Sequence, residues 1–150
     1  MPNFKPSLLR IESAIVERLR ARLPAEVGIY TGADLSSINE GNQPSPAVHV
    51  LYQGYAVTED RPDGRAARIM QTWTCVVAVR NARAQVTADA ARADAGEIAH
   101  AVCAALMGWR PIPELAPAHL KASVAPGAAA GFLYLPLSFI FENVVHGEPE

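Results

Sequence analysis

Apolar residues recur at helical spacing in two segments of the chain, residues 7–23 and residues 87–107. In each segment they return every three or four positions, which is typical of an amphipathic helix with one face on a core. Thr87 supplies a cap for the second helix, and Pro24 and Gly108 supply stop signals. The pattern therefore predicts two main helices.

Apolar residues recur at every second position in three further segments, residues 47–58, 66–80 and 133–142. Alternation with period two predicts β-strands. The first two segments flank Pro62-Asp63-Gly64, a sequence that favours a tight reversal, so we expect a long antiparallel hairpin. The second face of residues 66–80 is at least half apolar, which predicts a sheet that is covered on both sides.

Gly54 and Pro136 interrupt two of these strands. A glycine inside a strand has no side chain to pack, so Gly54 predicts a bulge or a bend. Pro136 cannot donate a ladder hydrogen bond, which leaves three arrangements open: the strand lies at an edge there, carries a bulge, or has Pro136 at a position without a ladder bond.

The remaining segments give weaker patterns. Residues 27–30 and residues 121–124 could each form a short strand. Residues 31–46 are rich in Gly, Ser, Asn and Pro and predict a long loop, which either contacts a partner or is a solvated connection. Residues 146–150 predict a frayed tail.

Together these elements predict a single α+β domain over residues 1–150, with a mostly antiparallel sheet, a long hairpin and two main helices packed on it. A chain of 150 residues fits one domain of ordinary size. With 50% hydrophobic and 19% charged residues, the composition is typical of a globular fold rather than a disordered chain.

Charge and cysteine usage exclude several partner classes. Thirteen Lys and Arg against fifteen Asp and Glu give a net charge of −2, so no field favours nucleic acid or an anionic membrane. Polar residues break every apolar run before it reaches the roughly 18 to 20 residues of a membrane helix. The chain starts without a signal sequence, and Cys75 and Cys103 lie in apolar segments. We therefore expect a soluble cytoplasmic product with reduced core thiols.

Candidate chemistry is sparse. Glu97 and His100 have the Glu-x-x-His spacing that di-iron bundles use, but the sequence offers no second pair of this kind. Cys103, three residues after His100, still leaves the set short of four zinc ligands. No serine lies in a Gly-x-Ser-x-Gly setting, and no glycine cluster resembles a phosphate loop. We expect no catalytic residues, no metal and no cofactor, although a small enzyme with an unrecognised site stays an alternative.

Two surfaces instead suggest contacts between proteins. The second helix carries His100, Cys103 and Met107 opposite its main apolar stripe, where charged residues would be typical. A helix that is apolar around most of its circumference is normally buried from two sides, which predicts a subunit contact. Arg61 and Arg65 lie among acidic residues at the hairpin tip, a pattern that suits an ion-paired protein contact.

The order of elements and four segments resemble the tail terminator proteins of Mu-like prophages and long-tailed phages. The segments are residues 11–19, QTWTCVVAV at 71–79, AGEIAHAVCAALMGW at 95–109 and LPLSFIFEN at 135–143. The resemblance covers most of the chain as a pattern of residues, without a metal or nucleotide signature.

The resemblance implies a structural protein of the virion tail that is made in the cytoplasm of the bacterial host. It would form a ring homo-oligomer, commonly a hexamer, on the last ring of tail tube protein, end tube polymerisation and present a surface to the head-tail connector protein. No catalytic residues come with that family. We assign His100, Cys103 and Met107 to a subunit contact, and Arg61, Arg65 and the 31–46 loop to ring or tube contacts. A head-tail completion protein stays an alternative.

Overall fold

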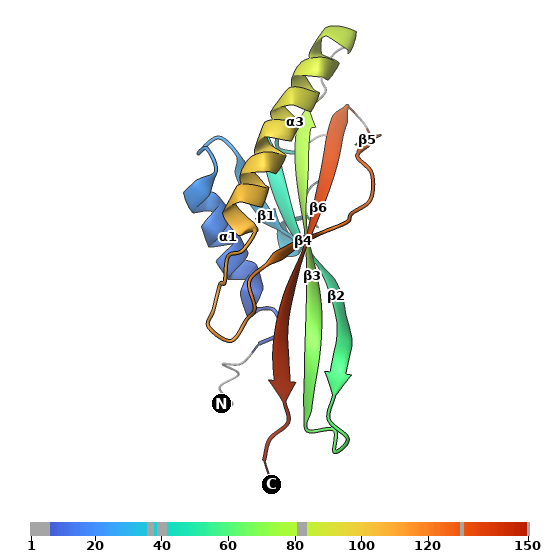
Figure 1. Cartoon of the computed structure of the whole chain (residues 1–150). Coiled ribbons are helices and arrows are strands. Elements are labelled where there is room, and N and C mark those ends of the chain that lie inside the picture. The colour runs from blue at the N-terminus through green and yellow to red at the C-terminus, as the bar shows by residue number, and fades with distance from the viewer. Residues whose placement is uncertain (1–6, 36–37, 39–41, 81–83, 130, 150) are drawn as a thin grey trace.

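The computed structural model describes residues 7–35, 38, 42–80, 84–129 and 131–149. Helices and strands are mixed along the chain without a regular order (Figure 1). The elements are α1 (Arg10–Arg22), β1 (Gly28–Thr31), α2 (Gly32–Leu35), β2 (Ala47–Asp60), β3 (Ala66–Arg80), α3 (Ala84–Leu106), β4 (His119–Lys121), β5 (Gly127–Ala129) and β6 (Phe132–His146).

All six strands belong to one sheet, which confirms the predicted α+β class. The strand order is β1-β2-β3-β6-β4, and β5 also pairs with β6. Only the β1–β2 pair is parallel, because β2, β3 and β6 run antiparallel to one another and β4 and β5 run antiparallel to β6. The sheet is therefore mostly antiparallel, with the predicted long hairpin formed by β2 and β3.

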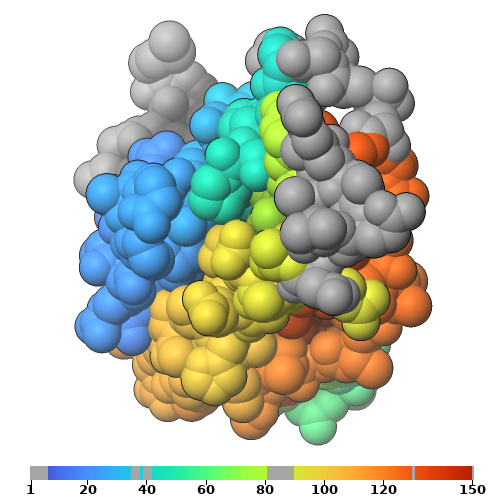
Figure 2. Space-filling model, turned by 90° about the horizontal axis from the view of Figure 1, so that it is seen from above, coloured from blue at the N-terminus to red at the C-terminus, as the bar shows by residue number. Residues whose placement is uncertain are grey.

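Helices α1 and α3 lie side by side on one face of this sheet, which we call the helix face (Figures 1 and 2). The core forms between this face and the two helices. Its largest fully buried side chains include Ile15 and Leu19 of α1, Trp73 and Val77 of β3, Leu106 of α3, and Phe139 and Phe141 of β6.

The predicted apolar stripe of α1 is confirmed except at its start. Ile11, Ile15, Val16 and Leu19 are buried, whereas the helix begins at Arg10 and leaves Leu8 exposed. Glu12, which follows Ile11, is half-buried and therefore keeps access to water.

Helix α3 is longer than predicted. Its first residue is Ala84, so the assignment of Thr87 as its cap is wrong, and Thr87 lies within the first turns. Its end agrees with prediction, because the helix stops at Leu106 and Gly108 takes φ +75, a conformation that glycine adopts without strain. Ile98 and Ala101 of the predicted stripe are half-buried at the rim of the core.

Arg18 connects the two helices. Its Nε–H donates to the Ala105 carbonyl at 2.9 Å, and its guanidinium lies 5.3 Å from the centre of the Trp109 ring. The last carbonyls of a helix lack intrahelical partners and carry partial negative charge, so a cation there is favourable.

We expect Arg18→Met to lower the free energy of unfolding by about 1.5–3 kcal/mol, the range for a hydrogen bond to a charged group. Urea denaturation measures this change, and Arg22→Met, at an exposed position near the end of the same helix, is the matched control. Equal losses in both variants would contradict the assigned role of Arg18.

The hairpin contains the predicted bulge at Gly54. Tyr52 lies opposite Trp73 and Tyr55 lies opposite Gln71, so β2 contains one more residue than β3 over this interval. Gly54 takes φ +93, which a glycine reaches without the steric cost of a Cβ atom. A second irregularity lies between Val57 and Glu59.

The prediction that the sheet is covered on both faces is confirmed for part of the opposite face. Both main helices lie on the helix face. On the opposite face Thr74, Ala78 and Ser138 are buried, whereas Met70, Thr72 and Val76 are half-buried. Near β1 this opposite face does have a cover, because Gln43 contacts the buried His49 there.

Pro136 lies where β6 is an edge strand. Antiparallel partners cover β6 on its outer side at Phe132–Tyr134, through β5, and at Ser138–Ile140, through β4. Pro136 falls between these intervals and keeps its place opposite Val76 in the β3–β6 ladder without a register shift. Of the three arrangements left open by the sequence, an edge at this position is the one observed.

Three boundary predictions need correction. The 31–46 segment is not one continuous loop, because α2 occupies Gly32–Leu35, and residues 36–37 and 39–41 lie outside the described residues. The strand expected at 121–124 is β4 at His119–Lys121. The tail is ordered further than expected, since β6 continues to His146. The strand expected at 27–30 is confirmed as β1.

Candidate assembly surfaces

The hairpin tip is held by an internal ion pair. The Arg61 guanidinium lies 3.0 Å from the Asp63 carboxylate, and the second oxygen of Asp63 accepts a hydrogen bond from the Arg65 N–H at 3.0 Å. Gly64 takes φ +74 and completes the reversal. Arg61 and Asp63 remain largely exposed, so the ion pair fixes the shape of the tip more than it stabilises the fold.

Arg65 also connects the tip to the end of β6. Its carbonyl accepts a hydrogen bond from the Gly147 N–H, and its guanidinium donates to the Glu148 carbonyl, both at 2.8 Å. The predicted frayed tail is therefore wrong for residues 147–148, which lie against the hairpin.

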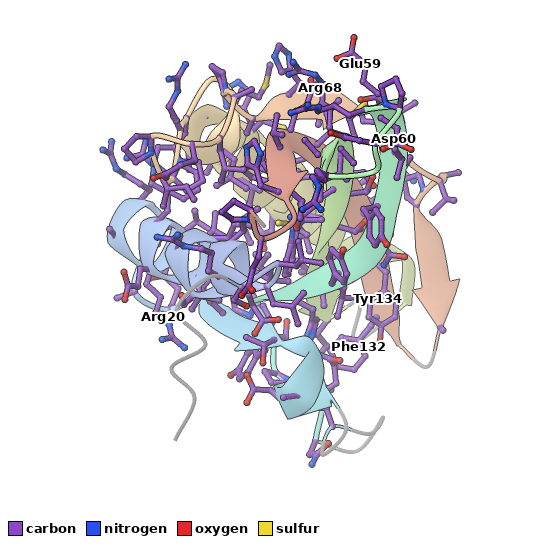
Figure 3. The ribbon with its side chains drawn as sticks, turned by 90° about the horizontal axis from the view of Figure 1, so that it is seen from below. Arg20, Glu59, Asp60, Arg68, Phe132 and Tyr134 are labelled. Carbon is purple, nitrogen blue, oxygen red and sulfur yellow. The ribbon has the colours of Figure 1, made fainter. Side chains whose placement is uncertain are left out.

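A second group of charges crosses the strands just behind the tip. Arg68 on β3 lies 3.1 Å from Glu59 on β2 and 3.7 Å from Glu142 on β6. Figure 3 shows Glu59, Asp60 and Arg68 gathered at this end of the sheet. These side chains are exposed, and the row of opposite charges is consistent with the protein contact that the sequence suggests there.

The predicted contact residues on α3 and directly after it divide into two groups. His100 is exposed and Met107 is 52% exposed, so both are available to a partner. Cys103 is half-buried and packs against the core, and desolvation raises the pKa of its thiol. Cys103 therefore borders the exposed helix surface, whereas His100 and Met107 lie on it.

Cys75 is fully buried on β3 beneath the helices. Desolvation raises the pKa of its thiol to about 12, with a smaller contribution from the nearby Cys103 thiol. A thiol that stays protonated at neutral pH is a poor nucleophile. Cys75 thus acts as a small apolar core residue, as its place in an apolar row suggests.

Glu97 and His100 do not form part of a larger ligand set. Among the residues that the structure describes, no group of three His, Cys, Asp or Glu side chains is placed to hold a metal ion. Glu97 lines a hollow together with Arg80 and Asp94, and His100 lies outside it. No helix among the described residues has the length and apolar character needed to cross a membrane.

A buried histidine fixes the segment that precedes β2. The Nε2 atom of His49 lies 3.0 Å from the Gln43 side-chain nitrogen, which also donates to the Pro44 carbonyl. Because that nitrogen belongs to an NH2 group, His49 Nε2 accepts, and the proton of the neutral ring is on Nδ1. Burial lowers the pKa of His49, and the Asp34 carboxylate opposes this shift with a smaller effect.

We expect stability to fall as the pH drops below the unfolded pKa of His49, about 6.5. The unfolded chain binds a proton there that the folded chain takes up only at lower pH, so the free energy of unfolding decreases until the folded pKa is passed. Urea denaturation between pH 7.5 and about pH 5 measures the slope, and His49→Gln should make it shallower. An unchanged slope in that variant would contradict the assignment.

The sequence contains a signal for α2 that pattern analysis missed. Thr31 and Asp34 have the spacing of a capping box. The Asp34 carboxylate accepts hydrogen bonds from the Thr31 N–H at 2.8 Å and from the Thr31 hydroxyl at 3.1 Å. These bonds hold the pKa of Asp34 below its usual value. The four-residue helix is too short for apolar periodicity to reveal it.

Comparison with known proteins gives a matching family and several similar solved chains. A chain of the virion of a native gene transfer agent particle has 16% sequence identity and a TM-score of 0.47, over 91% of this chain and 95% of that chain. No curated protein sequence matches. The family model for the phage tail terminator protein matches residues 7–149, a range that includes every helix and strand described above. The chain therefore belongs to the phage tail terminator family and is a structural protein of phage tails.

Proposed function

We propose that this protein forms a ring on the end of the tail tube, ends tube polymerisation and offers the head-tail connector protein a surface. The family match over residues 7–149 carries this proposal. The mechanism depends on shape: one face of the ring matches the tube end, and the other gives further tube subunits nothing to pair with. No bond is made or broken in this role.

A ring that closes head to tail uses two different patches on each subunit. The exposed part of α3, with His100 and Met107 on it and Cys103 at its border, is one candidate. The hairpin tip with Arg61 and Arg65 is another. Figure 1 shows the C-terminal end of α3 beside α1 and the tip at the far end of the β2–β3 hairpin, so they are separate patches. This separation supports a division between contacts to neighbouring copies and contacts to the tube.

The ring number that we propose is six, with the tail tube protein and the connector protein as partners. The protein would be made in the cytoplasm of the bacterial host and end in the virion tail. The 31–46 segment is a further candidate for ring or tube contact. Near its end, Gln43 contacts the buried His49 of the sheet.

Electron microscopy of particles that lack this protein tests the proposal. We expect tails of excess length without heads, because nothing stops tube growth or forms the joint. Native mass spectrometry of the purified protein, alone and with tail tubes, should detect the ring. Tails of regulated length that only fail to join heads would instead indicate a head-tail completion protein, and particles that mature normally would contradict both functions.

A further inference from the structure

The distal parts of three strands form an arm that extends beyond the helices. We define the arm as residues 55–60 of β2, 66–71 of β3 and 141–146 of β6. Figure 1 shows these strand ends projecting past α1 and α3 toward the hairpin tip. The arm has β3 at its centre and β2 and β6 at its two edges.

Within the described ranges, both edges of the arm lack a neighbouring strand. β1 pairs with β2 only as far as Val50, and β4 pairs with β6 only from Ser138 to Ile140. One hydrogen bond, from the Ala116 N–H to the Glu142 carbonyl, reaches the β6 edge. An edge strand whose main-chain groups are free is a template for pairing with another chain.

Exposed apolar side chains of the arm lie on its edge strands. On β2, Tyr55 is 57% exposed and Val57 is 55% exposed; on β6, Val144 is 40% exposed and Val145 is 39% exposed. Ile69, on the central strand between them, is 3% exposed. Proteins usually protect edges with charge, proline or a covering segment, so apolar edges indicate surfaces that become buried on assembly.

Strand direction then determines how copies could meet. β2 and β6 both run antiparallel to β3, so they run parallel to each other. Rotation about a ring axis along the strands preserves this direction and brings the β2 edge of one copy beside the β6 edge of the next. Such a contact joins two different edges, and in a closed ring it leaves no arm edge free.

We propose that the arms of neighbouring copies pair edge to edge, with the distal part of β2 parallel to the distal part of β6 of the next copy. The arms then form one continuous sheet around the ring. This inference rests on the ring of the proposed function and identifies the contact that closes it. The occupant of each edge is a second copy of this chain.

Cysteine crosslinking tests the pairing. The double variant Val57→Cys, Val145→Cys is made in a Cys103→Ser background, where the remaining native thiol, Cys75, is fully buried. A short bismaleimide is added to the assembled protein on tail tubes. We expect a ladder of covalent oligomers that ends at the ring number. Each single variant should stay monomeric under denaturing electrophoresis, and a mixture of the two single variants should give dimers.

The outcomes separate this inference from the proposed function. A ring that is visible by native mass spectrometry and microscopy but gives no ladder overturns edge pairing and leaves the function standing. A crosslink to the tail tube protein instead of a second copy also overturns it. Absence of a ring on the tube overturns both. If the double variant does not assemble, Ala56→Cys with Val144→Cys, one position back along each of the two parallel edges, gives the same test.

Discussion

Replacement of Trp73 by alanine should lower the free energy of unfolding by about 3–5 kcal/mol, the range for removing a large aromatic side chain from a core. Trp73 is 0% exposed at the centre of β3, and its ring lies 4.8 Å from that of Tyr52. Its Nε1–H donates to the buried Gln71 side-chain oxygen at 3.2 Å. Truncation therefore leaves both a cavity and a buried acceptor without its donor.

Urea denaturation measures this loss, with Trp109→Ala as the matched control. Trp109 is half-buried and packs against the edge of the core beneath the Arg18 guanidinium. Its removal should cost less than the removal of Trp73. Phenylalanine at position 73 fills most of the cavity but cannot donate the hydrogen bond. The free energy of unfolding of Trp73→Phe should therefore lie between those of the parent and the alanine variant. A larger loss for Trp109→Ala would contradict the placement of the core.

Reversing the charge of the hairpin tip should disrupt tail assembly while the fold is retained. In the double variant Arg61→Glu, Arg65→Glu, a carboxylate faces Asp63 and the side-chain bond to Glu148 is lost. These contacts are exposed, so we expect a stability change of only about 0–1 kcal/mol for the ion pair. If the tip contacts the tube or a neighbouring copy, tails should lose their regulated length or fail to join heads, as microscopy would show.

The control for this experiment is Arg22→Glu with Arg110→Glu, which makes the same change in net charge at two exposed positions away from the tip. Normal tails in the control and abnormal tails in the tip variant would locate the effect at the hairpin. Tails of regulated length and normal head joining in both variants would remove Arg61 and Arg65 from the mechanism.

Local patterns in the sequence predicted the parts of the fold that local physics determines. The stripe of α1, the turn at Pro62–Gly64, the bulge at Gly54 and the alternation of β6 each depend on residues close together in the chain. The family resemblance rested on residues 11–19, 71–79, 95–109 and 135–143, and it is confirmed over residues 7–149.

The errors occurred where distant segments decide the outcome. Alternation in β3 showed that its outer face is at least half apolar, but not that both main helices pack on the other face. The sequence of residues 146–150 does not indicate that Arg65, about eighty residues away, donates a hydrogen bond to the Glu148 carbonyl. Cys103 was grouped with His100 and Met107 by helical spacing, yet it turns far enough toward the sheet to pack on the core. Whether such a residue is buried or ordered depends on its tertiary neighbours rather than on its local propensity.

The bulges in β2 also determine which residues report on which surface. Tyr52 lies opposite Trp73, so even-numbered residues before Gly54 point toward the helices; after it, Tyr55 and Val57 point that way instead. A fluorophore attached at position 56 would sense the opposite side of the sheet from one at position 52, although the two numbers have the same parity. Probes along this strand must be placed by the observed register. Counting odd and even positions from the start of the strand would assign residues between the two bulges to the wrong face of the sheet.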